Sequence, residues 1–221
     1  MPAATSPSCR RCGACCRRGG PALHEEDRPL VEEGGIPLRD LFTVRRGEWV
    51  REPMRPGLVQ LAAEIVKVKG AGGGWACRLY DEASRACRIY ERRPRECRLL
   101  DCRDPHPLLE AYPRGRLTRI NLLAAAPHFR DLVLDHERRC DLGTAWRLLQ
   151  TGEGPAAQRL AEMAHYDAEL RRLLVGRGGL DAGLLDFLFG RPVETVLRLF
   201  RRRLAHGPDA AEEGADEGGP P

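Results

Sequence analysis

Apolar positions spaced for one helical face dominate the second half of the chain. Between residues 155 and 175 they recur at intervals of three and four, which is typical of a helix with one buried stripe. Shorter segments over 127–140, 143–150 and 183–189 show weaker helical patterns, and Pro192 can open a last amphipathic helix. The pattern therefore predicts that the chain after Arg116 is helical.

The pattern before that point is irregular and suggests short elements. The pattern over residues 23–33 predicts a helix that ends at Gly34-Gly35. A short helix or turn is expected over 38–44. Val66 and Val68 alternate with Lys67 and Lys69, which is the two-residue period of a strand.

A hairpin is predicted from this strand. The five residues 70–74 are expected to form a turn, and residues 75–80 the returning strand. A further short strand is expected at 86–89, across a turn over 81–85. A short helix is expected to begin near Pro94.

The first cysteine run, Cys-x2-Cys-x2-Cys-Cys, falls in a stretch that has no apolar residues to pack against. Its four members are Cys9, Cys12, Cys15 and Cys16. Two-residue gaps let a loop direct its sulfurs to one centre, as thiolate metal sites require. The first three positions match the spacing of ferredoxin runs and favour an iron–sulfur cluster, whereas a Zn²⁺ ion on part of the run stays open. If the run is extended, Cys15 and Cys16 point apart and serve different sites.

A second group of cysteines lies about sixty residues further along. Its members are Cys77, Cys87, Cys97 and Cys102. A four-coordinate site on the first run still needs a remote thiolate, and this group is the source of such ligands. We therefore expect the sulfurs of both groups to converge.

Composition sets the remaining bounds. The chain is 42% hydrophobic and 31% charged, with a net charge of +4. So mild a charge, with only 5% aromatic residues, argues against a nucleic-acid partner and leaves a protein partner open. The sequence contains no apolar run that resembles a signal peptide or a membrane span, which predicts a cytoplasmic protein. Reduced thiols are the rule in that compartment, and nine cysteines, an odd number, fit metal ligation better than disulfides.

The cysteine segments resemble a known family. They are similar to the bacterial YkgJ-type CxxCxxCC cysteine-cluster family. The similarity is carried by Cys9 to Cys16, by Asp101-Cys102 and by the stretch Cys87-Arg-Ile-Tyr-Glu-Arg-Arg-Pro-Arg-Glu-Cys97-Arg. That family is described as a zinc- or iron-chelating domain, and the resemblance covers residues 9–102. It implies that all eight cysteines bind metal, with an iron–sulfur cluster or Zn²⁺ as the cofactor. It implies no reaction.

One further pair in the helical half is a candidate for ligation. His136 and Cys140 are four residues apart and so share a helical face, the geometry of a metal-binding helix. The alternative is a surface histidine beside a cysteine that packs in the core. The sequence leaves both interpretations open.

The patterns combine into an α+β protein. We expect a Cys-rich metal-binding region with a short antiparallel hairpin over residues 9–112, followed by a helical region packed on it over 113–205. Residues 1–8 and the acidic tail 206–221 are predicted to be disordered.

Three functions fit this organisation. The first is a metal-binding cysteine-cluster protein of undefined role. The second is a metal-cluster-dependent protein-modifying enzyme, because some flagellin lysine methylases look similar in their cysteine region. The third is a nucleic-acid- or protein-binding module in which zinc is structural. Whether the protein is an enzyme is left open.

Overall fold

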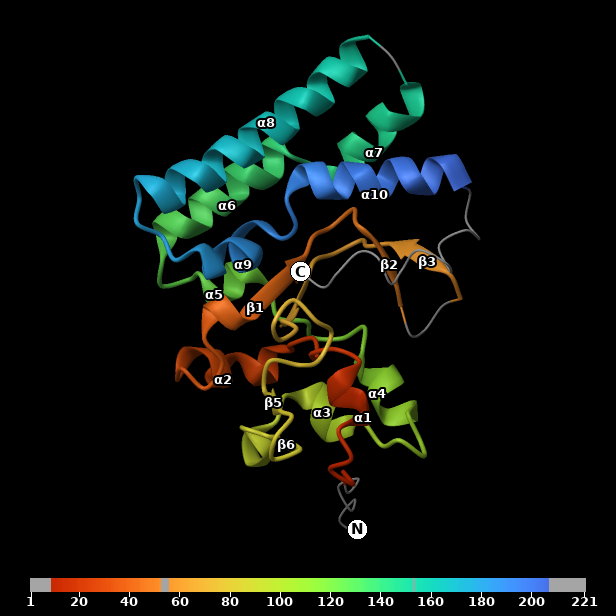
Figure 1. Ribbon diagram of the computed structural model, residues 1–221, viewed down its shortest axis with the longest axis vertical. Helices are drawn as coiled ribbons and strands as arrows, with labels where there is room; N and C mark the ends of the chain where they lie inside the picture. The colour runs from red at the N-terminus through yellow and green to blue at the C-terminus, as the bar shows by residue number, and fades with distance from the viewer. Residues whose placement is uncertain (1–8, 53–55, 153, 207–221) are drawn as a thin grey trace.

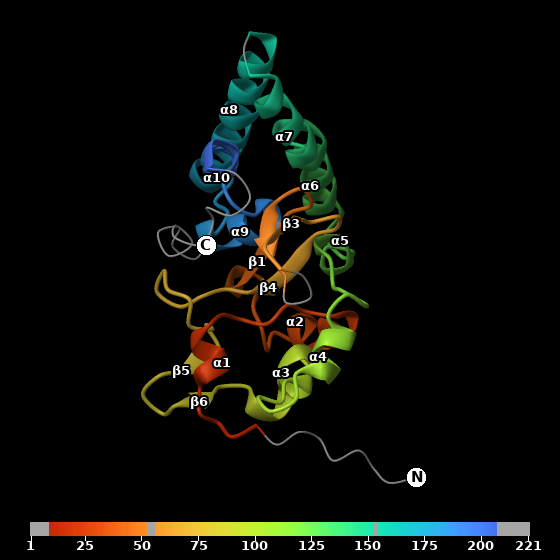
Figure 2. The same cartoon turned by 90° about the vertical axis from the view of Figure 1, so that its right-hand side faces the viewer.

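The computed structural model describes residues 9–52, 56–152 and 154–206. The disorder expected for residues 1–8 and 207–221 lies outside these ranges. The molecule is elongated, with the C-terminal helices at one end and both cysteine groups at the other (Figures 1 and 2). A small sheet lies between the two ends. The protein is thus a mixed α/β structure with short antiparallel pairs in its N-terminal part and helices in its C-terminal half.

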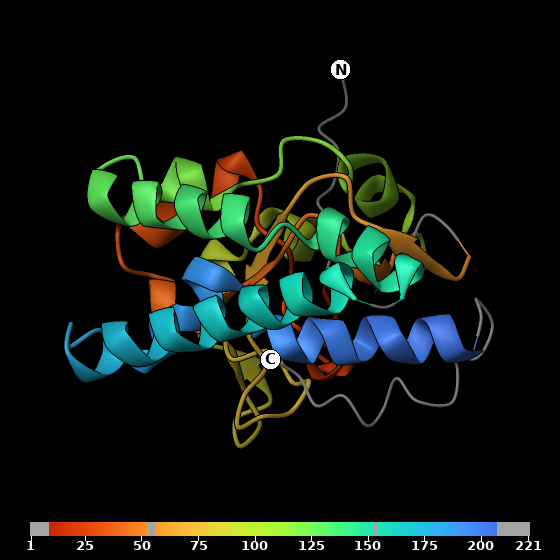
Figure 3. The ribbon, with the colours of Figure 1, turned by 90° about the horizontal axis from the view of Figure 1, so that it is seen from above.

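Four long helices form the end remote from the cysteines. They are α6 (Pro127–Arg139), α7 (Leu142–Thr151), α8 (Pro155–Gly176) and α10 (Val193–His206). Helix α8 runs alongside α10 (Figure 3), and a core that includes Leu160, Met163 and Phe200 fills the space between the helices. The helices predicted from apolar periodicity are therefore confirmed. No helix in the described ranges is both long enough and apolar enough to span a membrane.

Aspartate caps mark the start of helix α7 and of the turn that leads into α9. Asp141 accepts a hydrogen bond from Thr144 N at the start of α7, at 2.7 Å. Asp181 accepts one from Gly183 N, at 2.8 Å, and thereby starts the 3₁₀ turn η4 (Ala182–Leu184) that leads into α9 (Leu185–Phe189). Such caps satisfy amide groups that have no partner within the helix.

The sheet departs from the predicted hairpin. Strand β1 (Leu41–Val44) pairs antiparallel with β4 (Ile65–Val68), so that Leu41 faces Val68. Only the turn η2 (Leu38–Asp40) corresponds to the helix or turn expected over 38–44. Every residue of β1 is buried, so the strand lacks the apolar–polar alternation by which an exposed strand is recognised.

The expected partner strand, residues 75–80, makes only one isolated bridge to this region, between Gly70 and Cys77. The further strand expected at 86–89 is confirmed in part: β6 (Ala86–Cys87) pairs antiparallel with β5 (Tyr80–Asp81), and the two form a short hairpin in the cysteine region. A further pair, β2 (Trp49–Arg51) with β3 (Leu58–Gln60), was not predicted from the sequence.

The helix predicted for residues 23–33 is shorter than expected. It consists of the turn η1 (Glu25–Asp27) followed by α2 (Arg28–Glu32). Pro29 lies in the first turn of α2, where the missing amide proton is tolerated. The remaining short elements are η3 (Tyr90–Arg92), α3 (Arg95–Leu99), α4 (His106–Ala111) and α5 (Arg119–Leu122).

A buried ion-pair network attaches the sheet to the helices. Arg45, which follows β1, donates to Glu137 of α6 at 2.6 Å, and Arg119 of α5 donates to the same carboxylate at 2.8 Å. Arg119 also binds Glu64, the residue before β4, through Nε at 2.9 Å. Both guanidinium side chains are at most 1% exposed. Burial alone would raise the pKa of Glu137, but the two arginines outweigh it and lower the pKa to about 2.

Candidate metal centre

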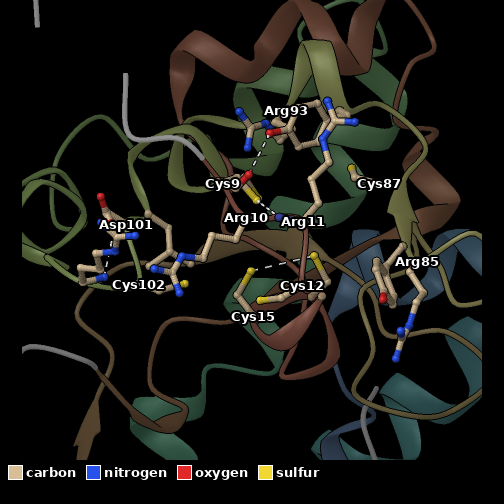
Figure 4. Close-up of a pocket in the computed structure, with 17 residues that line it drawn as sticks. Cys9, Arg10, Arg11, Cys12, Cys15, Arg85, Cys87, Arg93, Asp101 and Cys102 are labelled. Atoms are coloured by element: carbon tan, nitrogen blue, oxygen red, sulfur yellow. Dashed lines mark hydrogen bonds between the residues drawn. The ribbon is translucent and has the colours of Figure 1, made fainter. Parts of the chain in front are cut away.

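Elements from both cysteine groups surround one cavity of about 140 Å³. The loop from residue 9 and helix α1 (Ala14–Arg17) form one side (Figure 4), and β6, α3 and the loop that follows α3 form the other. Seven cysteines line the cavity: Cys9, Cys12, Cys15, Cys16, Cys87, Cys97 and Cys102. Members of the two groups therefore lie around the same space despite the sixty residues between them.

Direct contacts hold the two groups together. Cys77 N donates to Cys16 O at 2.6 Å, which joins the backbone of the second group to that of the first. Tyr90 OH lies 3.5 Å from Cys9 O and bridges the same two segments. Cys77 itself does not line the cavity, because its side chain is buried in the apolar core beside Leu79 and Tyr80.

Cys15 and Cys16 are closer than an extended run would place them. Both belong to α1, and their Sγ atoms are 3.9 Å apart. A hydrogen bond from the Cys16 thiol, with a smaller effect of the nearby Arg93, lowers the pKa of Cys15 to about 6, and the same bond raises the pKa of Cys16. The separation of the two thiols was expected only for an extended run, and that condition is not met, because both cysteines are helical.

The more buried thiols resist ionisation. Burial raises the pKa of Cys77 to about 11 and also raises the pKa of Cys97. Metal ligands must be thiolates, so a metal that binds such groups displaces protons. Metal uptake by this cavity is therefore expected to strengthen as the pH rises.

Gly13 sits where no side chain fits. Its φ of +74° favours glycine, and an added Cβ would lie 2.6 Å from Cζ of the buried Tyr80. Tyr80 is held in turn by Arg17, whose Nη2 donates to Tyr80 OH at 3.0 Å. This close approach lets α1 start directly against the second cysteine group.

Gly13→Ala is expected to destabilise the protein by about 2 kcal/mol more than Gly72→Ala and to reduce its bound metal. Gly72 is a matched control, because its φ is also positive, at +59°, but an added Cβ meets nothing within 4 Å. Urea denaturation and metal analysis measure the two effects. Equal losses in the two variants would show that the contact with Tyr80 does not matter.

Three residues that the sequence analysis missed hold the helix that carries Cys97. Asp27 accepts from Arg95 N at the start of α3, at 2.7 Å, and Glu96 accepts from Ala22 N at 2.8 Å. The buried His24 lies 3.4 Å from the other oxygen of Glu96. The 22–27 segment thus holds α3, and with it Cys97, in position. No local sequence signal links partners that are some seventy residues apart.

His136 and Cys140 lie in the helical half and do not line the cavity. His136 is fully buried, and its Nε2 is 2.7 Å from the Asp167 carboxylate. Cys140 is buried against Met163, whose carbonyl accepts from its thiol at 3.5 Å. The two residues share a helical face, as predicted, but that face is turned towards the helical core. The alternative of a surface histidine beside a core cysteine is therefore right for Cys140 but wrong for His136, which is buried.

The donor set fits a thiophilic metal. Every potential ligand that the sequence placed at this end is a cysteine, and thiolates bind zinc and iron–sulfur clusters. Among the described residues, no three Cys, His, Asp or Glu side chains converge closely enough to hold a single metal ion. The thiols are instead distributed around the cavity.

Comparison with known proteins agrees with this chemistry. Residues 8–108 match the family model CxxCxxCC, which is described as "Putative zinc- or iron-chelating domain". The match covers just under half of the chain. Neither a curated protein nor a solved structure matches the sequence. The resemblance to the CxxCxxCC family is thus confirmed over residues 8–108.

Proposed function

We propose that this is an iron–sulfur protein of the cytoplasm, whose cluster lies in the cavity between the two cysteine groups. The single observation that supports it most is that seven cysteines from two distant segments line one space. In this proposal, residues 9–112 form the metal-binding region and residues 113–205 the helical region that supports it.

The spacing of the thiols favours a cluster over a single zinc ion. Tetrahedral Zn²⁺, with Zn–S bonds of about 2.3 Å, holds its four sulfurs roughly 3.8 Å apart. Cys15 and Cys16 lie at a comparable distance, 3.9 Å, but no three Cys, His, Asp or Glu side chains among the described residues converge closely enough to hold one metal ion. A cluster carries each thiolate on a separate iron and so accepts sulfurs that are distributed around a cavity.

The ligands follow from the spacing and the cavity. Cys9, Cys12 and Cys15 supply three thiolates with the spacing of a ferredoxin run. The fourth comes from the three members of the second group that line the same cavity, Cys87, Cys97 and Cys102. Cys77 has a supporting role in this arrangement, because it packs in the core behind the cavity.

A bound cluster supplies one-electron transfer. The protein's own residues set its environment. The positive charge of Arg93 favours the thiolate of Cys15, and the buried Tyr80 forms part of the cavity wall. Neither the protein-modifying enzyme nor the structural-zinc module is favoured by a specific observation in the described residues.

Anaerobic purification followed by iron, sulfide and zinc analysis tests the proposal. We expect iron and acid-labile sulfide together with a broad visible absorption band. Cys12→Ser is expected to abolish most of the bound iron, because it removes a thiolate from the run. Cys140→Ala is the matched control and should retain it, since Cys140 does not line the cavity. A colourless protein that retains zinc would overturn the proposal.

A further inference from the structure

Arginines are concentrated around the cavity. Five of them line it, Arg10, Arg11, Arg85, Arg93 and Arg103, together with a single acidic residue, Asp101 (Figure 4). This lining carries four more positive than negative side chains before any thiolate is counted. Nothing in the metal-binding chemistry of cysteine requires so many guanidinium groups.

The same bias extends over the whole cysteine end. Residues 9–20 and 76–104 contain twelve arginines and six acidic residues, whereas the whole chain has a net charge of only +4. The remainder of the chain is therefore slightly negative. A concave site lined by one sign of charge focuses its potential towards an oppositely charged ligand.

Two of the arginines stack on the same tyrosine ring. The guanidinium carbons of Arg11 and Arg93 lie 3.9 and 4.0 Å from the centre of the Tyr90 ring. One ring face accommodates one guanidinium group at this distance, so the two occupy opposite faces. Stacking uses the flat face of a guanidinium group and leaves its N–H edges free to bind a carboxylate or phosphate.

The N–H groups of these arginines are poorly matched by carboxylates of the protein. Arg11 has Glu91 at 3.8 Å, a distance too long for a good hydrogen bond. Nε of Arg93 is buried without a hydrogen-bond partner in the described part of the chain. The other cavity arginines, Arg10, Arg85 and Arg103, have no carboxylate oxygen of the described residues within 4.0 Å of a guanidinium nitrogen, the limit for an ion pair.

The bound cluster does not neutralise this charge. An oxidised iron–sulfur core with four thiolates has a net charge of roughly −2. Against the excess of four positive side chains, this leaves about two positive charges at the cavity. This charge balance rests on the proposed function, because a metal centre with more thiolate ligands would leave no excess of positive charge at the cavity.

From this charge and geometry we propose that the mouth of the cavity binds a small dianion, a phosphate- or carboxylate-bearing molecule, beside the cluster. Arg93 and Arg11 supply oriented N–H edges, as bidentate anion recognition requires. Arg10, Arg85 and Arg103 supply the surrounding positive charge.

Isothermal titration of the anaerobically purified protein with inorganic phosphate, and separately with malonate, tests the site. We expect saturable binding of at least one of the two, and the tighter ligand identifies the class. Arg93→Gln and the double variant Arg10→Gln/Arg103→Gln should each weaken that binding at least tenfold, and the double variant should leave the iron content unchanged. Arg88→Gln is the matched control, because Arg88 is exposed at the same end but does not line the cavity; it should change affinity less than twofold.

The two proposals fail in different ways. A protein that carries its cluster but binds neither anion at 10 mM, a level on the order of the weakest affinities of interest, overturns the anion site alone. Equal weakening by Arg88→Gln and Arg93→Gln also overturns it, because the attraction would then be a general effect of net charge. A protein that carries zinc in place of iron overturns the cluster, and titration of that zinc-loaded sample still decides the anion site, since a bound metal keeps the cysteine segments and their arginines in place.

Discussion

Glu137→Gln is expected to lower the free energy of unfolding by about 3 kcal/mol, with the metal centre left intact. The substitution keeps the size of the side chain but removes the charge that Arg45 and Arg119 share. Both arginines are almost fully enclosed, so water cannot replace the lost partner. Arg119 retains Glu64, which is why we expect the lower end of the range for broken buried pairs. Urea denaturation of the two proteins at pH 7 measures the difference.

Acid should remove this difference. The pKa of Glu137 is lowered from 4.5 to about 2 in the folded protein, so its stabilising effect is fully present above about pH 4.5 and is lost as the pH falls towards 2. The stabilities of the wild type and Glu137→Gln should therefore converge below about pH 4.5. Glu162→Gln is the matched control, because Glu162 makes an exposed pair with Arg159; it should cost about 0.5 kcal/mol or less. A similar loss in both variants would contradict a special role for the buried network.

Removing the metal is expected to loosen the two cysteine segments and leave the rest folded. Amide exchange over residues 9–20 and 76–104 should accelerate on the order of tenfold or more with an iron chelator under anaerobic conditions. The intervening strands β1 and β4 should stay protected, because Leu41 and Val66 pack in the core with Phe187 and Phe189 of α9. Hydrogen–deuterium exchange with mass spectrometry resolves these segments.

A cluster-free variant provides the control for this experiment. Cys12→Ser should exchange like the chelated protein from the outset and should show no further change on adding chelator. Loss of protection that spreads evenly through β1, β4 and α8 would contradict the prediction. It would mean that the metal stabilises the molecule as one cooperative unit.

The helical half was accessible from the sequence because its signals are long and periodic. Helix α8 repeats its apolar spacing over six turns, and proline opens α6 as well as α8. Strand β1 was missed because four residues that are buried on both sides have no period to detect. The sheet partner of β4 comes from an earlier segment, and no local pattern reports such a pairing.

The candidate site was only partly accessible. Spacing identified the cysteine run, and the count of ligands predicted that the second group would lie nearby. Sequence could not separate Cys77, which packs in the core, from the cysteines that line the cavity, because burial is a property of the tertiary fold. It also missed Asp27 and Glu96, whose partners are far away in the chain.

The order of the two cysteine groups along the chain has a consequence for biosynthesis. At about 5–20 residues per second, a ribosome needs roughly 4–17 s to extend the chain from Cys16 to Cys102. Until Cys102 is made, the nascent chain presents the first four thiols without the complete second group that surrounds their cavity. The half-site is then open to oxidants and to whichever thiophilic metal arrives first. Faithful loading of the centre therefore depends on delivery of the correct metal after translation has passed Cys102.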